Sequence, residues 1–309
     1  MTQVGSRSLF SYHSVPFGNH HISDRLRSKK RIYPKGMSES GQMTETISAT
    51  PLFGWEIHNK IHNTTDGFWG DIDTTHTFCE PHYTQSWYVA EFYNSISSLI
   101  FCILSGYLFH KFPKDRMIQA ANIWLLVLGI GSALFHGTMK YAMQLMDEGP
   151  MVGWLTTIIL AQLSCGRPWL IGKVIILQII VVLAALGLVL TYAMYDQYEI
   201  FIHGYGILVL VSIGMGTLII PDQQSRVAKL QQKAMVVCLV AIIVGKVCWE
   251  LENRLCDTYP LVWPLHAIWH IFACVSVYAA MINAYLCRMD PNNSIPDWFG
   301  FQLEKGKSA

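Results

Sequence analysis

The sequence predicts an all-α membrane protein with seven transmembrane helices, and three observations lead to that fold class. Hydrophobic residues make up 52% of the 309-residue chain and charged residues only 14%, whereas a soluble domain carries about 25% charge. Seven apolar runs follow Trp87, and each approaches the ~20 residues that a helix needs to cross a bilayer. These runs mostly lack the polar stripe of helices in soluble bundles. The formal charge of +1 argues against a nucleic-acid partner.

Each predicted helix is an apolar run that ends at a polar break. The runs are, in chain order, 88–109, 118–137, 148–165, 168–193, 201–220, 234–252 and 265–287. The breaks between them are His110–Arg116, Lys140–Asp147, Cys165–Pro168, Tyr195–Glu199, Pro221–Lys233 and Glu252–Pro264. Charged side chains and prolines in these breaks are poorly suited to the apolar interior of a bilayer. The break after the third run is the shortest, so the boundary there is the least sharp.

Basic residues in the short loops predict which side of the membrane each loop occupies. One set of loops holds most of them: Lys111, Lys114, Arg116, Arg167, Arg226, Lys229, Lys233 and Arg288. The loops on the opposite side hold only Lys140 and Arg254. We therefore expect the carboxyl terminus in the cytosol. Seven spans then place the amino terminus in a lumen, which we expect to be that of the endoplasmic reticulum or Golgi.

The predicted domain organisation has four parts. Residues 1–50 form a basic, serine-rich arm that we expect to be disordered, with an organelle transit peptide as the alternative. Residues 51–87 form a lumenal segment with many aromatic side chains, and Asn63 begins a glycosylation sequon there. Residues 88–287 form the seven-span domain, and residues 288–309 a cytosolic tail.

Five polar side chains lie at the ends of predicted spans, where such groups are costly and usually functional. Ser132 and His136 lie four residues apart at the end of the second run, and Asp147 precedes the third. His266 and His270 also lie four residues apart, so they share one helix face at the start of the seventh run. With the predicted orientation, all five lie at a similar depth near the lumenal face.

Three histidines at one depth predict a catalytic zinc ion, which takes three protein ligands and keeps a fourth position open. Zinc lowers the pKa of a bound water, which becomes a nucleophile near neutral pH. Asp147 could orient that water and move its proton, and Ser132 could hydrogen-bond the water or a developing oxyanion. The alternative is a set of unrelated core histidines that bond to buried carbonyl groups.

The same stretches resemble a known family. Glu91–Asn94, the block from Gly129 to Met151, and His266–His270 resemble the alkaline ceramidase family. The resemblance covers about residues 78–286 and implies a seven-span membrane hydrolase that cleaves the amide of ceramide, releasing sphingosine and a fatty acid. Its lipid substrate would lie among the spans.

The resemblance also implies roles for individual residues. His136, His266 and His270 match the family's zinc ligands. Asp147 matches the residue that orients the water, and Ser132 matches the position beside the oxyanion. The fold is also similar to that of the adiponectin-receptor proteins.

The resemblance is incomplete at a calcium site. Many family members carry Asp-Trp-Cys-Glu-Glu-Asn before the first span, and groups in that stretch bind calcium. Here Glu80 and Glu91 remain, whereas Thr77, Pro81 and His82 replace three pattern residues. Calcium prefers six to eight oxygen ligands. A calcium site at Glu80 and Glu91 is one possibility, and the other makes Glu91 a buried polar partner of another span.

Cys79 and Cys256 are the two cysteines that clearly lie on the predicted lumenal side, where disulfides persist. The family pattern also has cysteines at both places. We expect a Cys79–Cys256 disulfide, with two free thiols as the alternative. Near the end of the sixth run, Glu250 and Glu252 could bind substrate polar groups or form an interhelical hydrogen-bond cluster.

Two other functions compete with a zinc-dependent intramembrane amidase. A receptor-like member of the same superfamily would hold a structural zinc ion or hydrolyse slowly, but structural zinc sites are normally closed. A transporter or channel would spread polar groups through the bilayer midplane, whereas here they gather near one face. The sequence therefore favours the amidase. It does not identify a protein partner.

Overall fold

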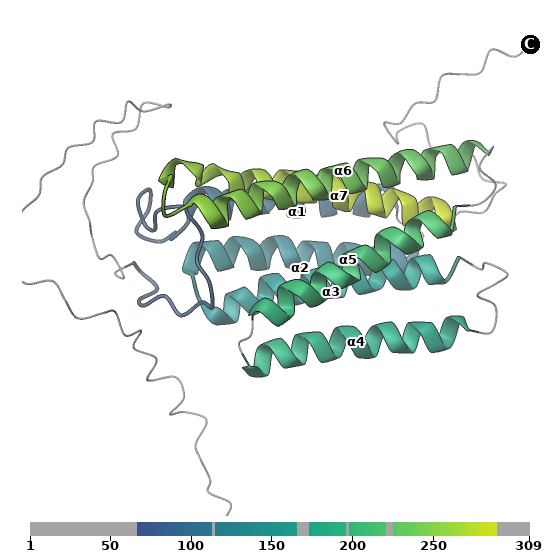
Figure 1. Ribbon diagram of the computed structural model, residues 1–309, viewed down its shortest axis with the longest axis horizontal. Coiled ribbons are helices and arrows are strands. Elements are labelled where there is room, and N and C mark those ends of the chain that lie inside the picture. The colour runs from purple at the N-terminus through teal and green to yellow at the C-terminus, as the bar shows by residue number, and fades with distance from the viewer. Residues whose placement is uncertain (1–66, 113–114, 166–172, 196–197, 221–224, 289–309) are drawn as a thin grey trace, which may run out of the picture. The chain divides into compact units, whose positions relative to one another are not determined.

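The computed structural model shows a helical bundle (Figure 1). It describes residues 67–112, 115–165, 173–195, 198–220 and 225–288. The helices are α1 (Phe92–Lys111), α2 (Arg116–Thr138), α3 (Tyr141–Leu163), α4 (Val174–Tyr195), α5 (Tyr198–Leu218), α6 (Arg226–Leu255), the short 3₁₀ helix η3 (Pro260–Val262) and α7 (Pro264–Arg288). The predicted all-α fold class is confirmed. The predictions for residues 1–50, Asn63 and the tail after Arg288 lie outside the described residues.

Six segments of the described chain are long and apolar enough to cross a bilayer: α1, α2, α4, α5, α6 and the segment 260–288 that contains α7. α3 has the length, because 23 residues span about 34 Å. Its first half, however, carries Gln144, Asp147 and Glu148. α3 packs against α2, α4, α5 and α7, which shelter it. Seven spans therefore stay a prediction, in which α3 is the inner helix.

The loop predicted over Lys140–Asp147 is wrong, because α3 begins at Tyr141. α2 ends at Thr138, and Met139 takes a left-handed conformation with φ of 50°. A left-handed residue ends a helix and turns the chain, so two residues are enough to join α2 to α3. Asp147 consequently lies almost two turns inside α3, and its polar neighbours face other helices rather than solvent.

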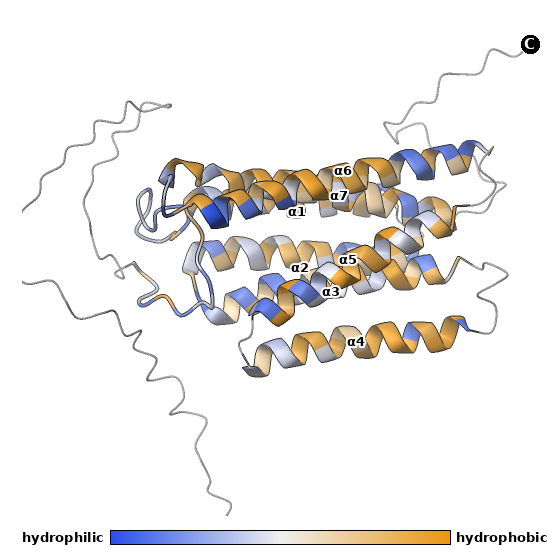
Figure 2. Ribbon diagram, in the orientation of Figure 1, coloured by the Kyte–Doolittle hydropathy of each residue, from blue (hydrophilic) through white to orange (hydrophobic). Residues whose placement is uncertain are grey.

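The other predicted spans match the helices, with shifted boundaries. α6 extends beyond the predicted 234–252 at both ends, because hydropathy detects only the apolar middle of a helix. α4 lies at the outside of the bundle: only Ala185 and Tyr192 of its side chains are buried. Figure 2 shows α4 to be apolar along most of its length. Such a surface suits a helix in contact with lipid chains.

α2 and α3 come into close backbone contact at Gly131. A Cβ atom at this position would lie 1.9 Å from the carbonyl oxygen of Met146. No larger residue fits here unless one of the two backbones moves. Ser132 follows Gly131, and Asp147 follows Met146, so this contact sets two of the predicted site residues side by side.

The segment before α1 packs across the ends of α3 and α6. Cys79 forms a disulfide with Cys256, with Cα atoms 5.5 Å apart. The backbone N–H of Thr75 donates a 2.9 Å hydrogen bond to Gln144 Oε1 in α3. A second cysteine pair within disulfide distance, Cys165 and Cys287, brings the chain after α3 to the last turn of α7, with Cα atoms 5.9 Å apart. Because α6 and α7 run in opposite directions, the two cysteine pairs lie at opposite ends of the bundle.

Candidate metal centre

His136, His266 and His270 meet inside the bundle. α2 supplies His136, and α7 supplies the other two from successive turns. One ligand atom from each residue lies within 4.8 Å of the others, and all three side chains are buried. The ring centroids are between 4.7 and 5.2 Å apart. The sequence-predicted ligands therefore form one group that could hold a metal ion.

Two carboxylates lie against two of these rings, and one of them holds its ring by a hydrogen bond. His136 Nδ1 donates to Glu91 Oε2 over 2.7 Å, and both side chains are buried. The backbone N–H of Glu91 also donates to the carbonyl oxygen of His136 over 2.9 Å, which locks the start of α1 to the end of α2. His266 Nδ1 lies 3.2 Å from Glu252 Oε2. Ionised carboxylates only accept, so the His136 ring carries its proton on Nδ1. His266 Nδ1 is buried and makes no hydrogen bond in the structure, although Glu252 lies beside it.

A serine fixes the third ring. Ser97 Oγ lies 2.7 Å from His270 Nδ1, and the Ser97 hydroxyl donates its own hydrogen to the carbonyl oxygen of Asn94 over 3.0 Å. The serine oxygen must therefore accept from His270 Nδ1. As with the His136 ring, this leaves Nε2 with its lone pair free to bind a metal.

A metal ion fits the residues present. His136 Nε2 is buried and has no hydrogen-bond partner in the structure, and an unpaired buried polar atom is costly. A cation bound by Nε2 would remove that cost. Three neutral imidazole nitrogens suit zinc and other late first-row metals better than magnesium or calcium.

Ser132 and Asp147 lie next to the histidines. The Ser132 hydroxyl lies beside the Asp147 carboxylate, and its oxygen is 2.9 Å from Ser98 Oγ. Both residues line the cavity that also reaches His266 and His270. Ser132 is one helical turn from His136 on α2. The structure thus brings all five sequence-predicted residues together.

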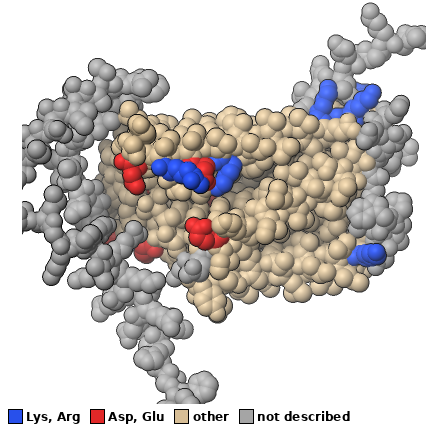
Figure 3. All heavy atoms as spheres, viewed as in Figure 1, with Lys and Arg blue, Asp and Glu red and all other residues tan. Residues whose placement is uncertain are grey.

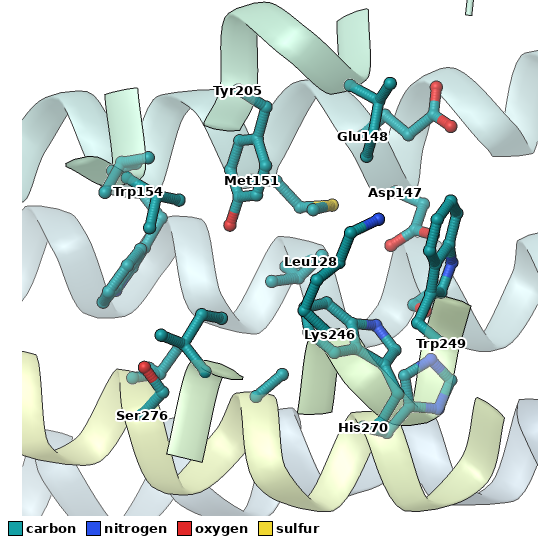
Figure 4. Close-up of a pocket in the computed structure, with 18 of the residues that line it drawn as sticks. Leu128, Asp147, Glu148, Met151, Trp154, Tyr205, Lys246, Trp249, His270 and Ser276 are labelled. Carbon is teal, nitrogen blue, oxygen red and sulfur yellow. The ribbon is translucent and has the colours of Figure 1, made fainter. Parts of the chain in front are cut away.

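A cavity of about 250 Å³ extends from this polar group into the bundle (Figure 4). Figure 4 shows Asp147 and His270 at one end of the cavity and Trp154 and Ser276 at the other. Aliphatic and aromatic side chains from six helices line most of its wall: Phe101, Leu128, Met151, Leu155, Phe201, Ile202, Tyr205, Val209, Ile242 and Val277. The cavity can hold an apolar chain whose polar end reaches the histidines.

Side chains before α1 cover the histidines. The Phe78 ring centroid lies 3.8 Å from that of His266 and 5.0 Å from that of His136. His76 stacks on Tyr198 of α5 at 4.0 Å between centroids, and burial lowers the pKa of His76 to about 4. Because the next residue after Phe78 is the disulfide-bonded Cys79, this cover is covalently tied to the end of α6.

Comparison with known proteins assigns the chain to a family, since the Ceramidase family pattern matches residues 70–304. The chain belongs to the ceramidase family. It is 31% identical over 230 residues to "Alkaline ceramidase" of Arabidopsis thaliana, covering 72% of this chain and 86% of that protein. It is 27% identical over 238 residues to "Alkaline ceramidase 3" of Mus musculus, with the same coverage. It is also 27% identical over 260 residues to "Alkaline ceramidase YPC1" of Saccharomyces cerevisiae, covering 75% and 81%.

In this ceramidase-family chain, the two carboxylates considered for calcium, Glu80 and Glu91, accept hydrogen bonds from other groups of the protein. Glu80 accepts the backbone N–H groups of Tyr93 and Asn94 over 2.7 and 2.8 Å, and so caps α1. His82 Nε2 lies 3.1 Å from Glu91 Oε1, and the other Glu91 oxygen bonds to a metal-site histidine. Burial raises the pKa of Glu80. The two carboxylates alone offer fewer oxygens than the six to eight that calcium prefers, so a calcium site at Glu80 and Glu91 stays a prediction.

Sequence reasoning missed two residues of this ceramidase-family site. Ser97 gave no usable signal, because a serine within an apolar run usually bonds to its own helix. Lys246 did carry a signal, since it is the one basic residue inside the predicted span 234–252. Glu252 accepts the Cys79 N–H over 2.9 Å as well as facing His266. This contact supports the interhelical cluster over a substrate-binding role.

Proposed function

We propose that this chain hydrolyses the amide bond of ceramide, releasing a long-chain base and a fatty acid. The observation that carries the proposal is the group of three buried histidines at the polar end of an apolar cavity. Membership of the ceramidase family supports ceramide hydrolysis in general. A lipid amide suits the cavity because its chains can pack on the apolar wall while its carbonyl reaches the histidines.

The proposal includes zinc at His136, His266 and His270. Zinc bound there would polarise the amide carbonyl and lower the pKa of a water molecule. The chain prepares two of the three rings in advance, because Glu91 and Ser97 hold His136 and His270 with Nε2 unprotonated. Such supporting hydrogen bonds preserve both the orientation and the basicity of a histidine ligand.

In this proposal Asp147 transfers the proton, and Ser132 donates a hydrogen bond to the developing oxyanion. Asp147 accepts a proton from the attacking water as the water oxygen bonds to the carbonyl carbon. It then passes that proton to the amide nitrogen as the carbon–nitrogen bond breaks. The Ser132 hydroxyl turns from the Asp147 carboxylate, its partner in the structure, toward the carbonyl oxygen as negative charge develops there.

We place the site near the lumenal face of an endoplasmic reticulum or Golgi membrane, with the amino terminus lumenal and the carboxyl terminus cytosolic. The Cys79–Cys256 disulfide, at the same end of the bundle as the histidines, supports this orientation, because disulfides persist in a lumen. The Cys165–Cys287 pair would then face the cytosol, where thiols are kept reduced.

Hydrolysis by the purified protein in lipid nanodiscs tests the proposed activity. We expect the wild type to release a long-chain base from ceramide, measured by mass spectrometry. Asp147→Asn and His270→Ala should lower that rate by at least about 100-fold, and zinc chelation should do the same. Glu199→Gln, at a carboxylate that is 81% exposed, is the matched control and should retain activity. Full activity in Asp147→Asn, or no release by a metal-loaded wild type, would contradict the proposal.

A further inference from the structure

Lys246 is an unusual residue in the wall of the cavity. In the part of the chain that the structure describes, it is the one Lys or Arg among the lining residues. It lies on α6, within a segment apolar enough to cross the membrane. Charged side chains in such segments are costly and commonly mark a substrate pathway. The proposed chemistry gives Lys246 no part, so its position calls for a separate explanation.

Lys246 lies at the depth of the histidines. Its neighbour Gly245 packs so closely on α7 that a Cβ atom there would lie 2.8 Å from Trp269 Cε3. Trp269 directly precedes His270. Lys246 and His270 therefore lie within about one helical turn of each other along the bundle. Figure 4 shows the Lys246 side chain extending over the cavity toward α3, the helix that carries Asp147 and Met151.

The contacts of the ammonium leave some of its hydrogens unused. Lys246 Nζ lies 3.4 Å from Glu250 Oε2 and 3.3 Å from the centroid of the Trp249 ring. The other oxygen of Glu250 accepts from Arg254 Nε over 2.6 Å. Figure 3 shows basic and acidic side chains clustered together on a face that is otherwise largely uncharged. An ammonium has three donors, so donors remain for a group in the cavity.

The surroundings favour a neutral oxygen over an anion as the acceptor. Glu250 already balances the charge of Lys246. Asp147 and Glu148 line the same cavity, and their carboxylates would repel a phosphate or sulfate group on a lipid. A hydroxyl oxygen can accept from the ammonium without adding charge.

On the basis of the proposed function, we propose that Lys246 is a specificity-determining residue that donates a hydrogen bond to a hydroxyl beside the scissile amide. Two positions in ceramides offer such a hydroxyl: carbon 4 of the long-chain base and carbon 2 of the acyl chain. Ceramides that carry either group would then be hydrolysed with a higher kcat/KM than ceramides that lack both.

Three ceramides with equal chain lengths test this inference. One has a sphinganine base and a plain acyl chain, one a 4-hydroxysphinganine base, and one a 2-hydroxyacyl chain. We expect the wild type to prefer one hydroxylated ceramide by about tenfold in kcat/KM, the size of one hydrogen bond to a charged donor. Lys246→Met should abolish that preference by slowing the preferred substrate alone, and Lys246→Arg should restore part of it.

Lys229→Met is the matched control, because Lys229 is an exposed lysine of the same helix that does not line the cavity. It should keep the wild-type preference. Equal kcat/KM values for all three ceramides in the wild type, or an unchanged preference in Lys246→Met, would overturn the inference and leave the proposed function intact. Faster hydrolysis of a ceramide 1-phosphate than of all three would overturn it in favour of an anionic group. Hydrolysis of none by the metal-loaded wild type would overturn both proposals. If Lys246→Met does not fold, Lys246→Gln provides the same comparison.

Discussion

At the scale of single residues, the site depends on the groups that hold the histidines. Glu91 is fully buried, and its two oxygens face His136 and His82. A buried carboxylate must be paired to remain ionised. The Glu91 side chain therefore fixes the start of α1 and the proton position of a metal-site ring at the same time.

Removing the charge of Glu91 should weaken metal binding. In Glu91→Gln the amide can still contact His136, but it no longer stabilises a ring that donates from Nδ1. We expect zinc affinity to fall by roughly 10- to 100-fold, as measured by competition with a chromogenic chelator. Glu199→Gln should bind zinc as the wild type does. Unchanged affinity in Glu91→Gln would show that Glu91 has only a structural role.

His76 should make the protein less stable at acidic pH. Its pKa is lowered from 6.5 to about 4 by burial, and its Nδ1 lies 3.1 Å from Gln144 Nε2, which suits the neutral ring. Below pH 6.5 the unfolded chain takes up a proton that the folded chain does not, so stability falls as the pH drops from about 6.5 to 4. Thermal unfolding should show a smaller loss over this range in His76→Gln. Equal losses in both proteins would contradict the assignment.

At the scale of the helices, hydropathy predicted the number of helices but not their contacts or all of their ends. His136, His266 and His270 could be grouped from spacing and depth alone. The start of α3 could not be predicted, because Lys140–Asp147 looks polar until its side chains are known to face other helices. The pairing of Ser97 with His270 depends on how α1 packs against α7, and a single sequence does not contain that information.

The α2–α3 contact at Gly131 should tolerate no side chain. Gly131→Ala would set a Cβ 1.9 Å from the Met146 carbonyl oxygen, so α3 and Asp147 must move. We expect destabilisation on the order of 1–3 kcal/mol and a large loss of hydrolysis. Gly106→Ala in α1 is the control, because a Cβ there meets nothing within 4 Å. Similar Tm values and rates for the two variants would contradict the predicted clash.

At the scale of the whole molecule, the two ends of the bundle differ. One end holds the histidine group, its cover of residues before α1, and the Cys79–Cys256 disulfide. The other end holds Cys165 and Cys287 and most of the basic residues of the short loops. The basic loops predict an orientation with the histidine end in a lumen, and the cysteine pairs at the two ends offer a test of it.

The redox state of the two cysteine pairs should report that orientation. With the histidine end in a lumen, Cys79 and Cys256 stay oxidised in cells, whereas Cys165 and Cys287 are reduced. Cells are acidified rapidly, denatured and then treated with maleimide–polyethylene glycol. The reagent should label Cys165 and Cys287 and leave Cys79 and Cys256 unlabelled. Cys79→Ser should expose a labelled thiol at Cys256. Labelling of the first pair and protection of the second would indicate the opposite orientation.

The most direct test of the whole account is the metal content of the purified protein. Inductively coupled plasma mass spectrometry should find one zinc per folded chain in the wild type. It should find none in a folded His136→Ala, His266→Ala, His270→Ala triple variant. A folded wild type without zinc, or a triple variant that keeps it, would contradict the claim that these three histidines form the metal centre of a lipid amidase.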